Sequence, residues 1–179
     1  MVLKNLYLIV GKSGTGKTTI VDNLSPIGVS IESYTTRPPR YKGELGHVFV
    51  SKEEFDKLDV VSYTEYNGYE YGITPDQIES HTFFVVDPAG VFYLLDHYKG
   101  KKPIHTIYLK TSLPERFARL VKRDGFKNAV KRILIDRKAF KGFEWWADLV
   151  VKNNEDYRVA AGKIRDYIRK AEFGRNKLE

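Results

Sequence analysis

The sequence contains no cysteine and a single methionine. The absence of cysteine excludes disulfide scaffolds, thiolate zinc sites and cysteine nucleophiles. No apolar run approaches the ~20 residues that a membrane span needs, and the segment before Gly11 is too short for the apolar core and cleavage site of a signal peptide. We therefore expect a soluble, cytoplasmic protein without a membrane partner.

Apolar residues, by contrast, are plentiful enough for a core. Of the 179 residues, 42% are hydrophobic and 13% aromatic, which fits one domain or one domain with a small insertion. Positive charge is concentrated, because residues 99–141 hold 14 Lys and Arg against 3 Asp and Glu, whereas residues 1–98 hold 8 against 13. Such a basic segment is typical of a protein that meets a polyphosphate, a nucleic acid or a membrane.

Short apolar runs separated by helix-length segments predict an α/β fold with a five-stranded parallel sheet flanked by helices. The expected strands are 6–10, 27–31, 82–86, 104–109 and 149–151. Cap residues predict helices after Ser51, from 75 to about 80, and after Ser112, and a terminal helix is expected over 154–170.

The stretch 33–80 differs from the rest of the chain. It alternates short β runs and contains Asn67-Gly68, a strong two-residue hairpin signal. We predict a mixed, mostly antiparallel β-rich insertion at 33–80, carried on a core made of 1–32 and 81–179.

The first expected strand runs into a phosphate-binding loop. Residues 11–18 read G-x-x-x-x-G-K-T between a strand and a helix. Glycines let the backbone turn its N–H groups toward phosphate oxygens, Lys17 reaches the β- and γ-phosphates, and the Thr18 hydroxyl binds Mg²⁺. The candidate ATP-binding residues are Gly11, Ser13, Gly14, Thr15, Gly16, Lys17, Thr18 and Thr19.

A second anion site is indicated about fifteen residues later. Arg37 and Arg40 lie three apart and are stiffened by Pro38 and Pro39, and guanidinium groups suit bidentate phosphate contacts. Two phosphate-holding elements in one small protein suggest a donor and an acceptor.

With these motifs the chain resembles the guanylate kinases. The shared order is Ser33-x-x-Thr36-Arg37-x-x-Arg40, Gly43-Glu44, Phe49-Val50-Ser51, Gly68-x-x-Tyr71-Gly72, Asp87-x-x-Gly90 and Arg119-Leu120-x-x-Arg123. The resemblance covers about residues 4 to 170. It implies a P-loop kinase core, a nucleotide-monophosphate-binding insertion and a short helical lid at about 120–138. The implied reaction moves the γ-phosphate of ATP, with Mg²⁺, to GMP, dGMP or another nucleoside monophosphate.

The resemblance also implies residue roles. Ser33, Arg37 and Arg40 would hold the acceptor phosphate or the residues around it, Tyr71 would donate to that phosphate, and Asp87 would approach the base and is a second candidate metal ligand. Lys17, Arg37 and three arginines from the lid and its flanking helices, Arg119, Arg123 and Arg132, would be catalytic, and Asn153 would contact the ATP base.

Three positions depart from the family pattern. The base-reading glutamate falls at Ser62, the hydroxyl residue after Tyr-Gly falls at Ile73 with Thr74 beside it, and a phosphate-binding tyrosine falls at His47. These positions remain candidate acceptor contacts, but guanine N1–H and N2–H would lack a carboxylate acceptor at Ser62. Glu65 could replace it only through a bulge, because strand alternation puts Glu65 on the opposite face.

Other interpretations stay open. A ribose-bisphosphate-type sugar-phosphate kinase of the same fold would need no base pocket. A non-catalytic guanylate-kinase-like binding module is a third possibility, against which Lys17 and Thr18 argue. No nucleic-acid motif accompanies the basic segment, so small nucleotides are the expected partners. The oligomeric state, monomer or homodimer, is left open.

Overall fold

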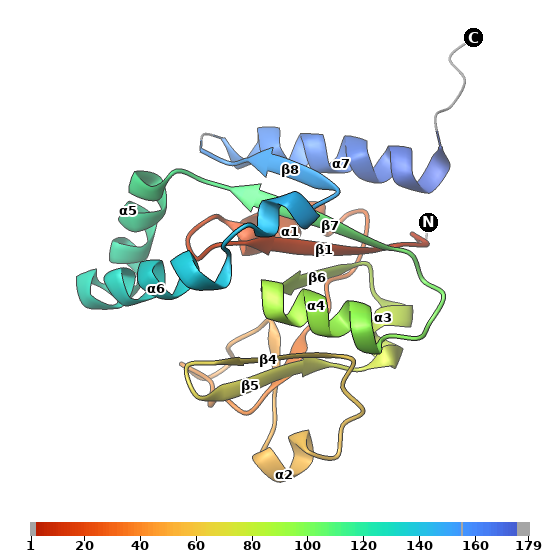
Figure 1. The fold of residues 1–179 in the computed structure, drawn as a ribbon, viewed down its shortest axis with the longest axis horizontal. Coiled ribbons are helices and arrows are strands. Elements are labelled where there is room, and N and C mark those ends of the chain that lie inside the picture. The colour runs from red at the N-terminus through yellow and green to blue at the C-terminus, as the bar shows by residue number, and fades with distance from the viewer. Residues whose placement is uncertain (1–2, 155, 175–179) are drawn as a thin grey trace.

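The computed structural model describes residues 3–154 and 156–174. Its central sheet has four parallel strands in the order β6-β1-β7-β8, with bounds Phe83–Val86, Leu6–Gly11, Ile104–Lys110 and Leu149–Lys152. The strand order and the interleaved helices confirm the α/β class, and Figure 1 shows this sheet running across the middle of the molecule.

The predicted fifth strand at 27–31 is wrong. The segment runs beside β6 but forms one isolated parallel bridge, from Ser30 to Phe83. The Ile31 N–H donates to the Phe83 carbonyl and the Phe83 N–H donates to that of Val29. Pairing stops there because β6 is short and the chain leaves toward a second sheet at Ser33.

Both faces of the central sheet are covered. Helices α1 (Lys17–Leu24) and α7 (Tyr157–Phe173) cover one face, and α4 (Pro88–His97) with α3 (Pro75–Ser80) covers the other (Figure 1). Strand β1 is buried along its whole length, and its side chains alternate between the two cores, as expected for a strand covered on both faces.

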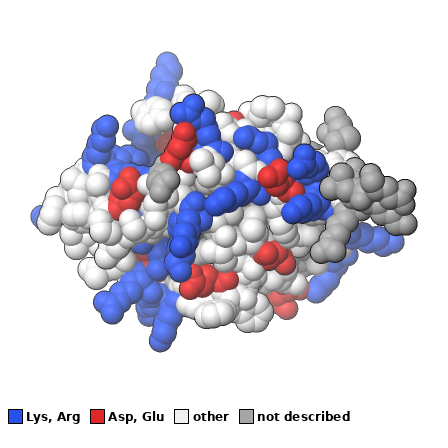
Figure 2. Space-filling model, turned by 90° about the horizontal axis from the view of Figure 1, so that it is seen from above, with Lys and Arg blue, Asp and Glu red and all other residues white. Residues whose placement is uncertain are grey.

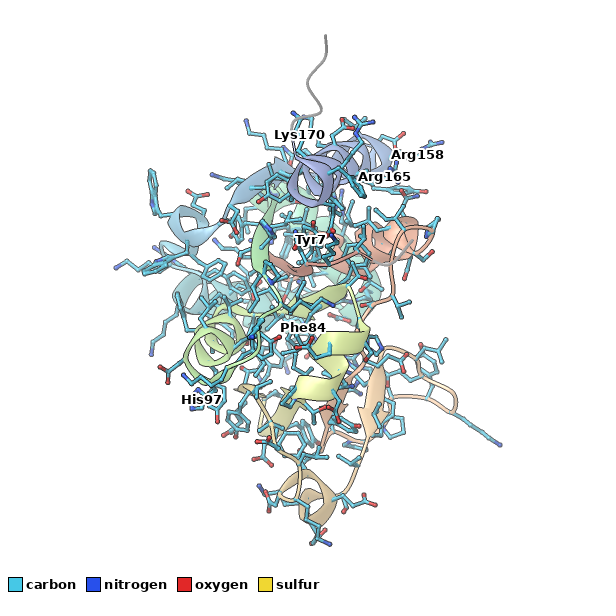
Figure 3. All side chains as sticks on the ribbon, turned by 90° about the vertical axis from the view of Figure 1, so that its right-hand side faces the viewer. Tyr7, Phe84, His97, Arg158, Arg165 and Lys170 are labelled. Carbon is cyan, nitrogen blue, oxygen red and sulfur yellow. The ribbon has the colours of Figure 1, made fainter. Side chains whose placement is uncertain are left out.

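Charge is spread over the surface on the α7 side. On the face shown in Figure 2, basic side chains lie interspersed with acidic ones. In Figure 3, Arg158, Arg165 and Lys170 project from α7 at one end of the molecule. Tyr7 and Phe84 lie in the interior of the molecule. This face therefore carries no single basic footprint.

The second sheet has the order β3-β2-β5-β4, with bounds His47–Phe49, Ser33–Thr35, Tyr69–Ile73 and Ser62–Tyr66. Strands β2 and β3 pair in parallel and the other pairs are antiparallel. Asn67 and Gly68 join β4 to β5 with φ values of 55° and 80°, which are the left-handed values that a two-residue hairpin turn requires. The hairpin prediction is confirmed.

Most predicted helix starts are also confirmed. A capping box at Ser51 opens α2 (Lys52–Phe55), and Thr74 caps α3. Ser112 precedes α5 (Leu113–Asp124). Helix α7 begins at Tyr157, later than predicted, because the Asp156 carboxylate caps it by accepting from the Arg158 N–H.

Helices α5 and α6 (Phe126–Ala139) pack together and meet at Gly125, whose φ is 80°. The pair extends past the carboxyl ends of β1 and β7, at the left of Figure 1, and is called the arm below. After α6, a short 3-10 helix, η1 (Phe143–Trp146), leads to β8. No helix within the described residues is both long and apolar enough to cross a bilayer.

Candidate active site

The phosphate loop joins β1 to α1. Gly14 and Gly16 take φ values of 80° and 88°, which side chains rarely tolerate. The Lys17 ammonium folds back on the loop and donates to the Gly11 carbonyl at 2.6 Å. Burial lowers the pKa of Lys17 to about 8; nearby Asp136 opposes the shift, and Arg123 and Arg116 add to it. The first turn of α1 leaves its N–H groups directed at the loop, as an anion site requires.

A cavity of about 250 Å³ connects this loop with the second sheet. Its walls come from four parts of the chain: the phosphate loop, β2 to β5, the end of β6, and α6 of the arm. The lining residues are Gly11, Ser13, Lys17, Ser33, Arg40, His47, Ser62, Thr64, Tyr66, Tyr71, Phe84, Val85, Val86, Asp87, Arg132, Ile135, Asp136, Ala139 and Phe140. The fold thus brings most predicted acceptor residues within one space beside Lys17.

The two arginines of the proline-stiffened loop share one carboxylate. Arg37 donates from both Nη atoms to Glu44, at 2.8 and 3.1 Å, and its guanidinium lies over the Phe49 ring. Arg40 donates its backbone N–H and one Nη to the same carboxylate. The hydrogen bond from Arg37 is the largest cause that lowers the pKa of Glu44 to about 2. Arg37 is buried and does not line the cavity, whereas Arg40 does.

His47 lies between Ser33 and Tyr71. Its Nδ1 is 2.9 Å from the Ser33 hydroxyl, and its ring meets the Tyr71 ring edge-on. Burial, followed by the nearby charge of Arg37, lowers the pKa of His47. The imidazole is therefore neutral at pH 7 and can act there as a hydrogen-bonding group rather than as a cation.

The end of the cavity near β6 holds hydroxyl groups and one carboxylate. Ser62 donates to the Gly90 carbonyl at 2.9 Å, and Thr64 donates to Asp87 at 2.9 Å. The other Asp87 oxygen accepts from the Gly90 N–H and caps α4. Strand β4 pairs with β5 without interruption from Ser62 to Tyr66, so no bulge brings Glu65 to this face.

Two predicted acceptor contacts lie elsewhere. Ile73 is fully buried in the core beneath α3, and Thr74 forms the capping box of that helix with Gln77. Neither residue lines the cavity. Both follow directly after the Tyr-Gly pair, but the chain turns there from β5 into α3, which directs them into the core and the cap.

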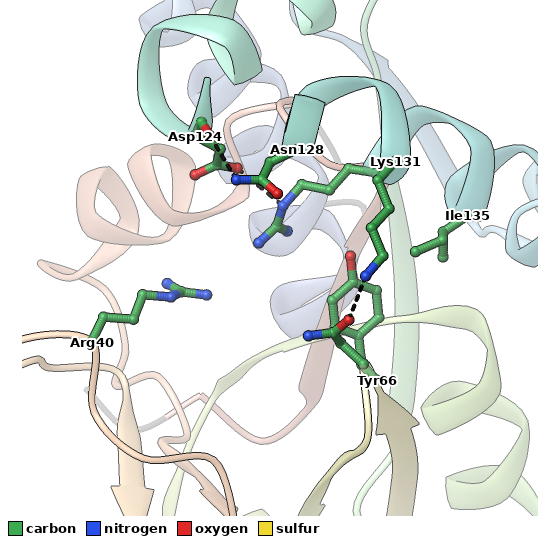
Figure 4. Close-up of a pocket in the computed structure, with 8 residues that line it drawn as sticks. Arg40, Tyr66, Asp124, Asn128, Lys131 and Ile135 are labelled. Atoms are coloured by element: carbon green, nitrogen blue, oxygen red, sulfur yellow. Dashed lines mark hydrogen bonds and ion pairs between the residues drawn. The ribbon is translucent and has the colours of Figure 1, made fainter. Parts of the chain in front are cut away.

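The arm arginines are paired in this structure. Arg123 and Arg132 both bind Asp124, at 2.8 and 3.0 Å, and the Arg123 hydrogen bond is the largest cause that lowers the pKa of Asp124. A second cavity of about 270 Å³ lies beside them. In Figure 4 it is faced by Arg40 from the loop after β2 and by Asp124 and Lys131 from the arm.

Asn153 supports the phosphate loop. Its side-chain amide is buried and donates to the Thr15 carbonyl at 2.8 Å, so the donor group expected to contact the ATP base is engaged by the loop itself. Arg119, also expected at the nucleotide, donates to Glu115 and to the Gly14 carbonyl.

Thr18 and Thr19 are exposed at the start of α1, where the Thr18 hydroxyl is available to a metal ion. Among the described residues no group of three or more His, Asp and Glu side chains gathers as a metal site. The single Thr18 hydroxyl fits a Mg²⁺ ion, because this ion usually keeps several waters and binds phosphate oxygens beside one or two protein ligands.

Sequence reasoning placed Glu44 in a shared motif without giving it a role, and it missed Asp124, Asp136 and Arg116, which also organise the site. Glu44 and Asp124 each hold two arginines, and Arg116 pairs with Asp136 beside Ser13. Asp124 and Asp136 are two of the three acids in the basic segment. Because acidic residues are so rare in that segment, their positions in the sequence could have indicated them as partners of its arginines.

The chain is similar to known proteins in part of its sequence and in its fold. No family model matches the chain. The guanylate kinase of Neisseria gonorrhoeae strain FA 1090 is 40% identical over 87 residues, or 42% of each chain, and that of Prochlorococcus marinus MED4 is 38% identical over 80 residues. The crystal structure of guanylate kinase from Anaplasma phagocytophilum matches with a TM-score of 0.66 over 96% of this chain and 88% of that one, at 24% identity. The chain is therefore similar to guanylate kinases over part of its sequence and over almost the whole of its fold.

The sequence match spans less than half the length of the curated guanylate kinases it resembles. The structural match extends over almost the whole chain and shows the guanylate kinase fold. An uncharacterized protein from Eubacterium ventriosum shares the fold more distantly, with a TM-score of 0.54 and 14% identity over 93% of this chain.

Proposed function

We propose that this chain is a nucleoside monophosphate kinase of the guanylate kinase type, which transfers the γ-phosphate of Mg-ATP to the phosphate of GMP, dGMP or another nucleoside monophosphate. The observation that carries the proposal is the cavity that joins Lys17 of the phosphate loop to Arg40, His47 and Tyr71 of the second sheet. Sequence and fold similarity to guanylate kinases support it. Because the proposed substrates are nucleotides, we expect the protein to be located in the cytoplasm.

In the proposed reaction an oxygen of the acceptor phosphate attacks the γ-phosphorus, and the bond from that phosphorus to the β–γ bridging oxygen breaks. Lys17 would neutralise charge on the transferring group, and Arg40 and Tyr71 would hold the acceptor phosphate. Mg²⁺, which Thr18 would help to hold, would supply further neutralisation. Such transfer needs positioning and charge more than covalent help from the protein.

We propose that Arg123 and Arg132 act by exchanging their present partner, Asp124, for the phosphates of ATP. Both bind Asp124. A triphosphate carries more negative charge than one carboxylate, so we propose that it draws these arginines from Asp124 onto its phosphates. Arginines on an arm that closes over both substrates also exclude water.

The test is an acceptor panel. The protein is given Mg-ATP with each nucleoside monophosphate, each deoxynucleoside monophosphate and ribose phosphates, and ADP is measured in a coupled assay. We expect acceptor-dependent ADP with at least one nucleoside monophosphate. ADP formation no higher than that of the Lys17→Ala variant with every acceptor would end the kinase proposal, and activity with ribose phosphates alone would replace it with a sugar-phosphate kinase.

Ser62→Glu should raise use of GMP relative to other acceptors. A carboxylate at this position can accept from guanine N1–H and N2–H, and a hydrogen bond to a charged group contributes about 1.5–3 kcal/mol, or roughly tenfold or more in kcat/KM. The measurement is the ratio of kcat/KM for GMP to that for the best other acceptor. Ser62→Gln has the same length without the charge and is the matched control. An unchanged ratio in Ser62→Glu would mean that position 62 does not contact the base.

ATP affinity should fall as the pH rises above about 8. Because burial lowers the pKa of Lys17 to about 8, the free protein loses the ammonium above that pH, and binding a triphosphate must then restore the proton. The dissociation constant should stay level below pH 8 and rise about tenfold per pH unit above it. Titration calorimetry between pH 7 and 10 measures this, with Lys17→Met as the control that should lose the slope. An equal slope in both proteins would contradict the assignment to Lys17.

A further inference from the structure

Ser13 of the phosphate loop is held on all sides by the arm. Its N–H donates to Asp136 Oδ2 at 2.7 Å, its hydroxyl donates to Asp136 Oδ1 at 3.2 Å, and its carbonyl accepts from Arg116 Nε at 2.8 Å. Asp136 comes from the end of α6 and Arg116 from the start of α5. Every polar group of Ser13 therefore has a partner 103 or 123 residues away.

The two charged residues also bind each other. Arg116 Nη2 lies 2.7 Å from Asp136 Oδ2, and the residues are only 5% and 3% exposed. Replacing a buried ion pair by apolar residues of similar volume is often neutral or stabilising, because desolvation of two charges offsets their attraction. Packing of α5 on α6 alone therefore does not require this pair.

The arm also touches the loop at the next residue. A Cβ atom on Gly14 would lie 2.9 Å from the Arg116 carbonyl oxygen and 3.2 Å from Leu120 Cγ, so α5 lies directly against the loop. Gly14 has the positive φ that begins the turn toward Lys17. The shape of the loop at Ser13 and Gly14 thus depends on where the arm lies.

We propose that Arg116 and Asp136 are positioning residues of the phosphate site, which hold Ser13 so that the following loop amides are arranged for phosphate before nucleotide arrives. This inference deepens the proposed function, since it concerns the same site. A loop already ordered in the free protein loses less conformational entropy on binding, which raises affinity. Because the Ser13 N–H is engaged by Asp136, phosphate is held by the amides that follow it.

The first experiment removes the pair without leaving a buried charge alone. Arg116→Met/Asp136→Leu keeps the net charge and similar volumes. We expect the dissociation constant for Mg-ATP, measured by calorimetry without any acceptor, to rise at least tenfold while circular dichroism stays unchanged. Lys110→Met/Glu144→Leu removes an exposed ion pair whose side chains, among the described residues, form no hydrogen bond with the loop; it is the matched control, which should bind within twofold of the natural protein. A change of less than twofold in the first variant overturns the proposal.

A second measurement needs no variant. In the nucleotide-free natural protein, hydrogen exchange of the Ser13 amide should be at least 100-fold slower than in an unstructured chain, because that N–H donates to a buried carboxylate. Exchange near the unstructured rate would overturn the proposal even if the double variant failed to fold. Both measurements omit the acceptor, so a failed acceptor panel would reject the proposed reaction without affecting this result.

Discussion

Lys17→Ala should lower turnover of Mg-ATP with the best acceptor by at least about two orders of magnitude. Removal of one preorganised donor to a developing charge typically costs about 10²–10³ in kcat. Lys17 is the first residue of α1 and lines the cavity. Its ammonium is held there by a hydrogen bond of 2.6 Å to the Gly11 carbonyl of the loop. Steady-state kinetics with acceptor and ATP both saturating measure the effect.

The fold of this variant should survive. Because burial lowers the pKa of Lys17 from its ordinary value to about 8, the folded protein binds this proton less tightly than the unfolded chain does. The charged lysine therefore opposes folding at neutral pH, and stability recovers as the pH rises from 8 to its ordinary pKa. The thermal midpoint of Lys17→Ala at pH 7 should be no lower than that of the natural protein. Near-normal turnover in a folded variant would contradict the role given to Lys17.

Arg37→Ala should also lower kcat/KM for the acceptor by at least about two orders of magnitude. In the structure Arg37 is not a wall of the cavity but a partner of Glu44, which also binds Arg40. Without Arg37 the carboxylate loses the hydrogen bond that keeps its pKa near 2, and its remaining charge competes with the acceptor phosphate for Arg40. We therefore expect the acceptor KM to rise as well as kcat to fall.

Two further variants separate the causes. Arg37→Lys keeps the charge but loses the paired Nη donors and the contact with Phe49, so most of the loss should remain. Glu44→Gln keeps the shape of the partner without its charge and should lose less than Arg37→Ala. Acceptor kinetics on proteins shown to be folded by circular dichroism measure both. If Arg37→Ala kept near-normal kcat/KM, the loop from Arg37 to Glu44 would have no part in acceptor binding.

The local elements of this protein could be predicted from the order of its residues. The phosphate loop, the Asn67-Gly68 turn and the cap at Ser51 each depend on backbone angles and hydrogen bonds within a few residues. The four strands of the central sheet were found for a similar reason, because buried parallel strands are continuous apolar runs. The expected strand at 27–31 has such a run, yet it makes one bridge, since the length of pairing depends on where the neighbouring strand ends.

Only the tertiary structure decided which partner each functional side chain has. Arg37 binds Glu44 instead of facing the cavity, Asn153 donates to the phosphate loop, and Ser13 is held by Asp136. A sequence motif specifies the residue type and the local backbone, but the contacts of Asn153 and Ser13 join segments 138 and 123 residues apart and arise only when the chain folds. The phosphate-binding chemistry can therefore be predicted from residues 11–18 alone. The contacts by which the arm holds that loop can be seen only in the folded structure.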